Sequence, residues 1–337
     1  MALIHTEDLS KHFKILNRRQ GLAGSVRDLF SRDYRTVRAV DGVSFDIEPG
    51  EIVGYIGPNG AGKSTTIKMM TGILKPTSGT ILVNGQVPYE NRIRQARTMG
   101  VVFGQRSQLW WELPVIESFR ILKEIYGVDQ QSFDKQMAMF DSLVGIGELY
   151  SQQVRTLSLG QRMLCDITAA FLHNPSVVFL DEPTIGLDVS IKAKIRSLIE
   201  ELNRAHNTTI ILTTHDLGDV EALSRRLIII DKGTILYDGS TEKVSDLVGS
   251  YRTLKVQLSQ QDGGNLNDGV RDRFGEDDGV SVQPEEDGWT AITIDQGRVP
   301  LSDVLNHVMT TSQVADVRIE EISMESVVKR IYDGALR

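Results

Sequence analysis

Short apolar runs recur through the first part of the chain and predict buried strands. They lie at 51–56, 177–180, 210–212 and 227–230. Apolar runs without polar alternation are typical of parallel strands that helices cover on both faces. Stretches with helical spacing separate these runs, so residues 1–240 are predicted to form an α/β domain.

The segment from 115 to 150 has a different pattern, because its apolar residues recur at the spacing of one helix face. These residues are Phe133, Met137, Phe140 and Val144. We interpret about 106–165 as a helical subdomain inserted into the α/β domain.

The pattern changes again after Gly239. Residues 254–258 alternate apolar and polar positions like a strand, and 261–279 is rich in Gly, Asp and Asn, as in a long loop with or without a short helix. The elements expected next are a strand at 289–294, a helix with Leu301, Val304, Leu305 and Val308, a strand at 317–322, and a last helix with Met324, Val327, Val328 and Ile331 that Ser323 caps and Gly334 ends. Residues 245–337 are therefore predicted to form a small α+β accessory domain.

Composition narrows the class of protein. The chain has 337 residues, a net charge of −8 and a pI near 5.4, which argues against a general nucleic-acid-binding surface. Its single Cys165 allows no internal disulfide and is expected to be a small core residue. No apolar run approaches the ~18 residues that cross a bilayer, and the first residues lack the pattern of a secretory segment. A cytoplasmic location is therefore expected.

A phosphate-binding motif follows the first apolar run. Residues 57–64 read GPNGAGKS, which matches G-x-x-x-x-G-K-S between a strand and a helix-compatible segment. Lys63 is expected to reach the β- and γ-phosphates of ATP, Ser64 to hold Mg²⁺, and Thr65 to donate to the α-phosphate. The residues predicted to hold the nucleotide here are Gly57, Pro58, Asn59, Gly60, Ala61, Gly62, Lys63, Ser64 and Thr65.

An acidic pair ends the apolar run at 177–180. Asp181 is expected to bind Mg²⁺, mostly through water. Glu182 is expected to polarise the water that attacks the γ-phosphate. The alternative is a surface pair of salt-bridged carboxylates, which the following residues 183–188 disfavour.

The pentapeptide LSLGQ at 157–161 stands between these two motifs. With them it makes residues 2–240 resemble the nucleotide-binding subunit of an ABC transporter. The resemblance implies a P-loop NTPase fold with a parallel-sheet core, an N-terminal antiparallel β portion and the inserted helical subdomain. The chain departs from the usual pattern where Leu159 replaces a glycine and Leu164 stands at a position that is often arginine, with Arg162 two residues earlier.

The resemblance also implies further site residues. Gln105 matches the Q-loop glutamine that contacts Mg²⁺ and the attacking water, and His215 matches the switch histidine that contacts the γ-phosphate. Asp188 matches the D-loop, which communicates between two sites. In the family the signature acts in trans, so Ser158, Gly160 and Gln161 are expected to contact ATP held by a second copy in a head-to-tail homodimer.

For each of three features, the sequence leaves two interpretations open. Either Phe13 or Tyr34 stacks on adenine, with 14–34 an insertion between them. This insertion carries basic residues and contacts a membrane partner or lipid headgroups, or it is a solvated surface helix. Trp110 and Trp111 either receive a membrane subunit or belong to the core. The basic residues of the insertion are Lys14, Arg18, Arg19, Arg27 and Arg32.

The predicted function is that of an ATPase subunit at the inner face of the cell membrane, docked on integral membrane permease subunits. The tail EEISMESVVKRIYDG at 320–334 resembles export-type ABC ATPases, in which such a domain supports dimerisation, although it could be a packing cap. Export is thus favoured over import. A soluble ABC protein acting on DNA or the ribosome is disfavoured, because the stretch from Lys63 to Ser158 is too short for a long coiled coil and one set of motifs is present.

Overall fold

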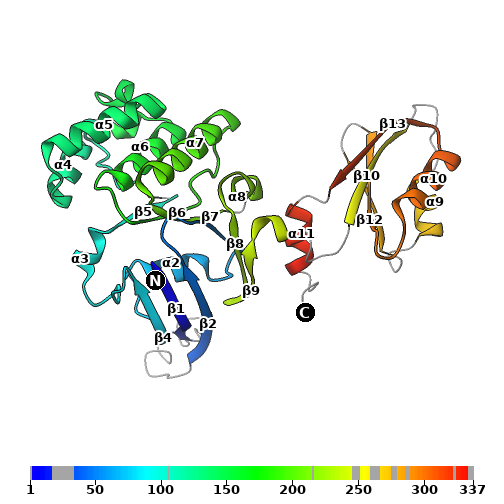
Figure 1. Ribbon diagram of the computed structural model, residues 1–337, viewed down its shortest axis with the longest axis horizontal. Helices are drawn as coiled ribbons and strands as arrows, with labels where there is room; N and C mark the ends of the chain where they lie inside the picture. Colours follow the sequence, from blue (N-terminus) through cyan, green and yellow to red (C-terminus); the bar gives the residue numbers. More distant parts are fainter. Residues whose placement is uncertain are drawn as a thin grey trace, which may run out of the picture. The chain divides into compact units, whose positions relative to one another are not determined.

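The chain folds into two compact units, Met1–Thr241 and Glu242–Arg337, in a computed structural model. Each unit is described by itself (Figure 1). The structure describes residues 2–16, 34–104, 106–214, 216–244, 251–258, 266–274, 279–285, 288–321 and 324–332.

A six-stranded sheet forms the centre of the first unit, in the order β5-β6-β7-β3-β8-β9. Its strands are β3 (Ile52–Ile56), β5 (Met99–Phe103), β6 (Val177–Asp181), β7 (Thr209–Thr213), β8 (Arg226–Asp231) and β9 (Thr234–Ser240). All neighbours pair in parallel except β8 and β9. The parallel-sheet core predicted from the apolar runs is confirmed, and the edge strand β9 was not predicted.

The central strands have unbroken apolar runs in their interiors because both faces of the sheet are covered. On β6, Val178 and Leu180 pack into a core shared with the helices, while Val177 and Phe179 pack into the opposite core. Figure 1 shows these helices gathered on one side of the sheet. They are α4 (Val115–Tyr126), α5 (Gln130–Val144), α6 (Leu159–Phe171) and α7 (Val189–His206). Three predicted residues, Phe133, Met137 and Phe140, are buried in this helical core.

The opposite core lies under a three-stranded antiparallel sheet and one helix. The sheet has the order β2-β1-β4, with β1 (Ile4–Leu16), β2 (Tyr34–Ile47) and β4 (Ser78–Val83), and the helix is α2 (Lys63–Met70). Leu16 pairs with Tyr34, so residues 14–16 of the predicted insertion continue β1. The remainder of that predicted insertion, with Arg18, Arg19, Arg27 and Arg32, lies outside the described residues.

Two short α-helices also belong to this unit. Helix α3 (Arg92–Ala96) precedes β5, and Asn91 caps it by accepting a hydrogen bond from the Arg94 amide. Helix α8 (Leu217–Leu223) follows β7 and is capped by Asp216. Cys165 of α6 is buried, as expected, and burial raises the pKa of its thiol to about 12.

The second unit is a four-stranded antiparallel sheet in the order β11-β12-β10-β13, with two helices on one face (Figure 1). The chain order is β10 (Tyr251–Leu258), α9 (Leu266–Arg273), β11 (Val280–Pro284), β12 (Trp289–Asp295), α10 (Leu301–Thr311) and β13 (Val314–Glu321). This is the split βαβ arrangement. Strand β11 was missed in the sequence. A last helix, α11 (Met324–Arg330), follows, and its predicted cap Ser323 and stop Gly334 lie outside the described residues.

Candidate active site

The phosphate loop joins the end of β3 to the start of α2. Its backbone is left-handed at Gly60, with φ 84°, and at Gly62, with φ 112°. A Cβ on Gly62 would lie 2.4 Å from the carbonyl oxygen of Ala39, and one on Gly57 would lie 2.5 Å from that of Ile230. The loop therefore needs glycine at positions 57 and 62 to pass this close to neighbouring backbone.

The side chain of Lys63 folds over this loop. Its Nζ donates to the carbonyl oxygen of Gly57 at 2.5 Å and to that of Pro58 at 3.3 Å. Burial lowers the pKa of Lys63, while the nearby carboxylates of Glu182 and Asp181 act to raise it. The ammonium group of Lys63 and the carboxylates of Asp181 and Glu182 therefore lie in one region, which is the charge arrangement of a phosphate-transfer site.

Asp181 ends β6 between two hydroxyl groups. Its Oδ1 accepts a hydrogen bond from Thr213 Oγ1 at 2.5 Å, and its Oδ2 accepts one from Ser64 Oγ at 3.5 Å. A carboxylate facing a hydroxyl is an oxygen donor set, and Mg²⁺ prefers one or two such protein ligands together with phosphate oxygens. Ser64 and Asp181 therefore fit a magnesium ion.

Glu182 follows at the carboxyl end of the same strand, with an unusual backbone. Its φ is 55°, a left-handed conformation that side chains other than glycine rarely adopt. Its amide donates to the carbonyl oxygen of Thr213 at 2.9 Å, and the Gly104 amide donates to the carbonyl oxygen of Asp181 at 2.8 Å. Backbone strain of this kind clusters at functional sites.

A cavity of about 920 Å³ opens over these groups. Two basic residues that the sequence reasoning missed, Lys68 and Arg106, line it together with Ile73 and Ile185. Lys68 follows Ser64 by one helical turn, and this spacing was a usable signal. The other lining residues are Ala39, Pro58, Asn59, Gly60, Ala61, Gly62, Lys63, Ser64, Thr65, Phe103, Gly104, Asp181 and Glu182.

Two predicted catalytic residues, Gln105 and His215, lie outside the described residues. Their neighbours are placed. Gly104 and Arg106 line the cavity on either side of position 105. Thr214 and Asp216 flank position 215, and the amide of Asp216 donates to Thr214 Oγ1 at 2.9 Å.

The signature pentapeptide forms the start of α6. Ser158 is the N-cap, and its Oγ accepts from the Gln161 amide at 3.2 Å while the Gln161 side chain accepts from the Ser158 amide at 2.9 Å. This is a capping box, which leaves the helix N-terminus well formed and positive. Both polar signature residues thus have a local role that the sequence reasoning did not identify.

The departures from the usual signature differ in exposure. Leu159 is 41% exposed, and its side chain packs beside Gly186. Leu164 is buried in the helical core, so no charged side chain fits there without partners. Arg162 instead lies over the ring of Trp111, 5.2 Å from its centroid. Trp111 is half exposed, and so it is not a core residue.

Asp188 caps the next helix. Its side chain accepts a hydrogen bond from the Ile191 amide at 2.9 Å, which starts α7. Ile191 packs against α6, where a Cβ on Gly160 would lie 2.8 Å from Ile191 Cγ2. The predicted D-loop and signature residues are therefore parts of one helix contact.

Neither aromatic candidate for adenine stacking, Phe13 or Tyr34, is among the described residues that line the cavity. Phe13 pairs with Val37, two residues from the cavity-lining Ala39. Tyr34 pairs with Leu16 at the far end of the same hairpin and is exposed.

Comparisons with known proteins agree with this geometry. The ABC transporter family model matches residues 40–185. Nod factor export ATP-binding protein I of Cupriavidus metallidurans is 33% identical over 207 residues, 61% of this chain and 68% of that protein. Methionine import ATP-binding protein MetN of Latilactobacillus sakei is 32% identical over 226 residues, 65% of this chain and 64% of that protein.

Two further comparisons concern length and fold. ABC transporter A family member 1 of Dictyostelium discoideum is 33% identical over 236 residues, which are 70% of this chain but 26% of that much longer protein. The dimeric post-hydrolysis structure of the ATP-binding cassette MJ0796, bound to ADP and Pi, has a TM-score of 0.58 at 22% identity and covers 70% of this chain and 98% of that one. This likeness confirms the predicted P-loop ATPase fold.

Proposed function

The chain belongs to the ABC transporter family of ATP-binding, ATP-hydrolysing domains, and from that premise we propose that it powers export through separate integral membrane permease subunits. The observation that carries the ATPase part of this proposal is the arrangement around Asp181. Its carboxylate meets the Ser64 hydroxyl of the phosphate loop, and Glu182 follows in a left-handed backbone conformation.

In the proposed reaction each residue of this group has one task. Lys63 binds the β- and γ-phosphates with the loop amides, and Thr65 donates to the α-phosphate. Ser64, Asp181 and Gln105 would hold Mg²⁺, which when bound neutralises charge on the phosphate oxygens. Glu182 accepts a proton from the attacking water, and His215 contacts the γ-phosphate.

We assign the other half of each site to a second copy of the chain. Ser158, Gly160 and Gln161 begin a helix of 13 residues, whose N-terminus attracts anions. Within one copy these residues do not line the described cavity over the phosphate loop. A head-to-tail homodimer that closes on ATP would bring them to the partner's γ-phosphate, and Asp188 would face the same interface.

For adenine we propose stacking on Phe13 rather than Tyr34. The supporting observation is the strand register, because Phe13 pairs only two residues from Ala39 at the cavity. Tyr34 pairs at the open end of the hairpin, several residues further along a strand that rises ~3.4 Å per residue.

Export is supported by the second unit. Barrel-like tails are common in importers, whereas this unit is an open four-stranded sheet with helices on one face. Import is the second candidate, and the relationship to MetN over 65% of the chain supports it. Comparing culture media and cell extracts of a deletion strain distinguishes them: loss of an exporter leaves the cargo inside cells, and loss of an importer leaves it in the medium.

The chain is proposed to act at the inner face of the cell membrane as a peripheral subunit. No helix in the described part of the chain is long and apolar enough to cross a bilayer. The half-exposed Trp111, stacked with Arg162, is the proposed contact for a permease subunit. The second unit is proposed to support dimerisation, and no nucleic acid partner is expected.

Purified Glu182→Gln protein tests the proposal. It should bind ATP, release phosphate at least about 100-fold more slowly than the wild type, and sediment as a dimer in saturating ATP. Glu200→Gln, a change at an exposed position of α7, is the matched control. Phosphate release at the wild-type rate, or a monomer at saturating ATP, would contradict it.

A further inference from the structure

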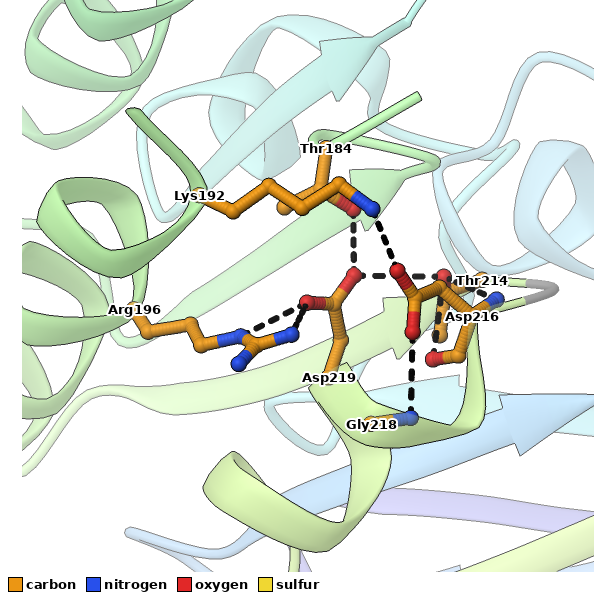
Figure 2. Close-up of polar contacts among 7 residues, drawn as sticks. All are labelled: Thr184, Lys192, Arg196, Thr214, Asp216, Gly218 and Asp219. Atoms are coloured by element: carbon orange, nitrogen blue, oxygen red, sulfur yellow. Dashed lines mark hydrogen bonds and ion pairs between the residues drawn. The ribbon is translucent and has the colours of Figure 1, made fainter. Parts of the chain in front are cut away.

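A second polar cluster, separate from the residues that line the cavity, is built around Asp219 of α8. This carboxylate is fully buried, at 0% exposure. Its Oδ1 accepts from Arg196 of α7, at 2.7 Å from Nε and 2.5 Å from Nη2. Its Oδ2 accepts from the hydroxyl of Thr184 and, at 3.5 Å, from that of Thr214 (Figure 2). One side chain therefore joins three separate segments.

Asp216 extends the cluster along the loop that contains position 215. Its Oδ2 accepts from Lys192 of α7, and its Oδ1 accepts from the Gly218 amide at 3.1 Å (Figure 2). The hydrogen bond from Lys192 lowers the pKa of Asp216, so the pair stays charged. Thr214 Oγ1 donates to the carboxylate of Asp219, which binds Arg196 of α7, and it accepts from the amide of Asp216, whose carboxylate binds Lys192 of α7. The residues on both sides of position 215 are therefore tied to α7.

Thr184 connects this cluster to Glu182. It is buried and lies two residues after the left-handed Glu182, in a turn where the Ile185 amide donates to the Glu182 carbonyl oxygen at 3.4 Å. A backbone conformation of this kind persists only where the surrounding structure over-determines it. The hydroxyl of Thr184 bound to Asp219 is one such constraint on the turn.

Energetics favour a geometric role over a simple contribution to stability. Desolvation of Asp219 and Arg196 offsets much of their attraction, so a buried ion pair adds little net stability over packed apolar side chains. Its hydrogen bonds nevertheless have fixed directions. They specify how the turn after Glu182, the loop around position 215 and helix α7 lie relative to one another.

We infer that Asp219 is a positioning residue for ATP hydrolysis, holding Glu182 and the loop of position 215 in register through Thr184, Thr214 and Arg196. The inference rests on the proposed role of Glu182 as the group that activates water. It adds that α7, which begins at Asp188, is mechanically tied to that carboxylate. A movement of α7 at a dimer interface then changes the geometry around the attacking water.

The sharpest test uses two substitutions of Thr184. Thr184→Val keeps the shape and removes the hydroxyl, whereas Thr184→Ser keeps the hydroxyl. Thr184→Val and Asp219→Asn should each lower kcat for ATP by about 10- to 100-fold, with KM and binding of a fluorescent ATP analogue changed less than about twofold. Thr184→Ser should restore kcat to near the wild-type value. The kcat of the double variant, with Thr184→Val and Asp219→Asn combined, should be no lower than that of the slower single variant. Both substitutions act on the same contact, between Thr184 and Asp219.

A second ion pair controls for effects on stability alone. Arg226 on β8 forms a bidentate pair with Asp238, at 2.8 Å for each bond. Asp238→Asn should lower Tm less than Asp219→Asn, because Asp238 is partly exposed and Arg226 keeps Glu51 as a partner, and it should leave kcat per bound nucleotide unchanged. Equal losses of kcat in Thr184→Val and Thr184→Ser, or losses that only follow Tm across all variants, would overturn the inference.

Glu182→Gln, measured in the same assay, separates the two proposals. If it leaves kcat intact, the proposed role of Glu182 fails. If it abolishes hydrolysis while Thr184→Val keeps the wild-type kcat, the ATPase proposal holds and the positioning role of Asp219 is wrong.

Discussion

Gly160 of the signature lies so close to Ile191 of α7 that an added Cβ would come within 2.8 Å of Ile191 Cγ2. The two helices are in direct contact at the point where both of them begin. The glycine is therefore required locally for helix packing, in addition to any contact that it makes with phosphate.

Gly160→Ala should separate the starts of α6 and α7. Overpacking of a buried contact costs ~1–3 kcal/mol of unfolding free energy, and we expect ATPase activity to fall with it. Ile191→Ala, which removes the opposing atoms, should restore Tm in the double variant. Urea unfolding and phosphate release measure both effects, and a double variant as unstable as Gly160→Ala alone would show that the contact is not the cause.

Leu159→Gly should leave ATPase activity unchanged or raise it. The side chain is 41% exposed and packs beside Gly186, so its removal frees the backbone without opening a core cavity. Glycine near a helix start costs at most ~1 kcal/mol of stability. Steady-state kinetics decide the matter, since complete loss of activity would mean that the leucine itself is needed to close the site.

Capping and phosphate contact by Ser158 can be separated with two variants. Ser158→Ala removes the hydrogen bond to the Gln161 amide and should cost ~1 kcal/mol. Ser158→Asp restores the cap, so its Tm should match the wild type, but its charge repels the γ-phosphate. In thermal unfolding, Ser158→Asp should thus be more stable than Ser158→Ala. In ATP-dependent sedimentation, Ser158→Asp should form less dimer than Ser158→Ala. Normal dimerisation of Ser158→Asp in ATP would exclude the phosphate contact.

Asp166 of α6 predicts a pH dependence of stability. Burial raises its pKa to about 6, from 3.8 when unfolded, although the Gln108 amide and Ser107 hydroxyl both donate to Oδ1. Between these values the native protein holds a proton that the unfolded chain has lost, so this contribution to stability declines as pH rises towards 6. Asp166→Asn keeps an oxygen for both donors and should be more stable than the wild type by up to about 3 kcal/mol above pH 6.

Urea unfolding of both proteins from pH 4 to 7 measures that difference. His173 has the opposite sign, because burial lowers its pKa to about 4, but it is present in both proteins and cancels. Parallel stability profiles for Asp166→Asn and the wild type would contradict the assignment.

Local periodicity predicted much of the fold. The strands β3, β6, β7, β8 and β12 and the helices α10 and α11 are confirmed, because each has an apolar pattern of its own. Strand β11 was missed, since Val280–Pro284 is short, ends in proline and follows a glycine-rich stretch. Strand β9 has no buried apolar residue to signal it.

In the candidate site, too, the sequence predicted the residues that follow one another in a motif and missed contacts between distant segments. The phosphate loop and Asp181 were found because their residues are contiguous in sequence. The contacts of Asp219 with Thr184 and Arg196 join residues from three separate segments, and single-sequence spacing does not identify such pairs. The capping box of Ser158 and Gln161 was visible as S-x-x-Q but was obscured by the resemblance to the family signature.

The central claim is that each ATP site is shared by two copies of the chain, and a nucleotide-dependent cross-link tests it most directly. Ile73, which lines the cavity, and Thr156, two residues before Ser158, are both exposed, and the only cysteine, Cys165, is buried, so cysteines introduced at these two positions leave the predicted phosphate contacts in place and react without background. In Glu182→Gln protein carrying Ile73→Cys and Thr156→Cys, a short bis-maleimide should give a covalent dimer with ATP and little with ADP. Absence of that dimer in ATP, or equal yield without nucleotide, would contradict the shared site.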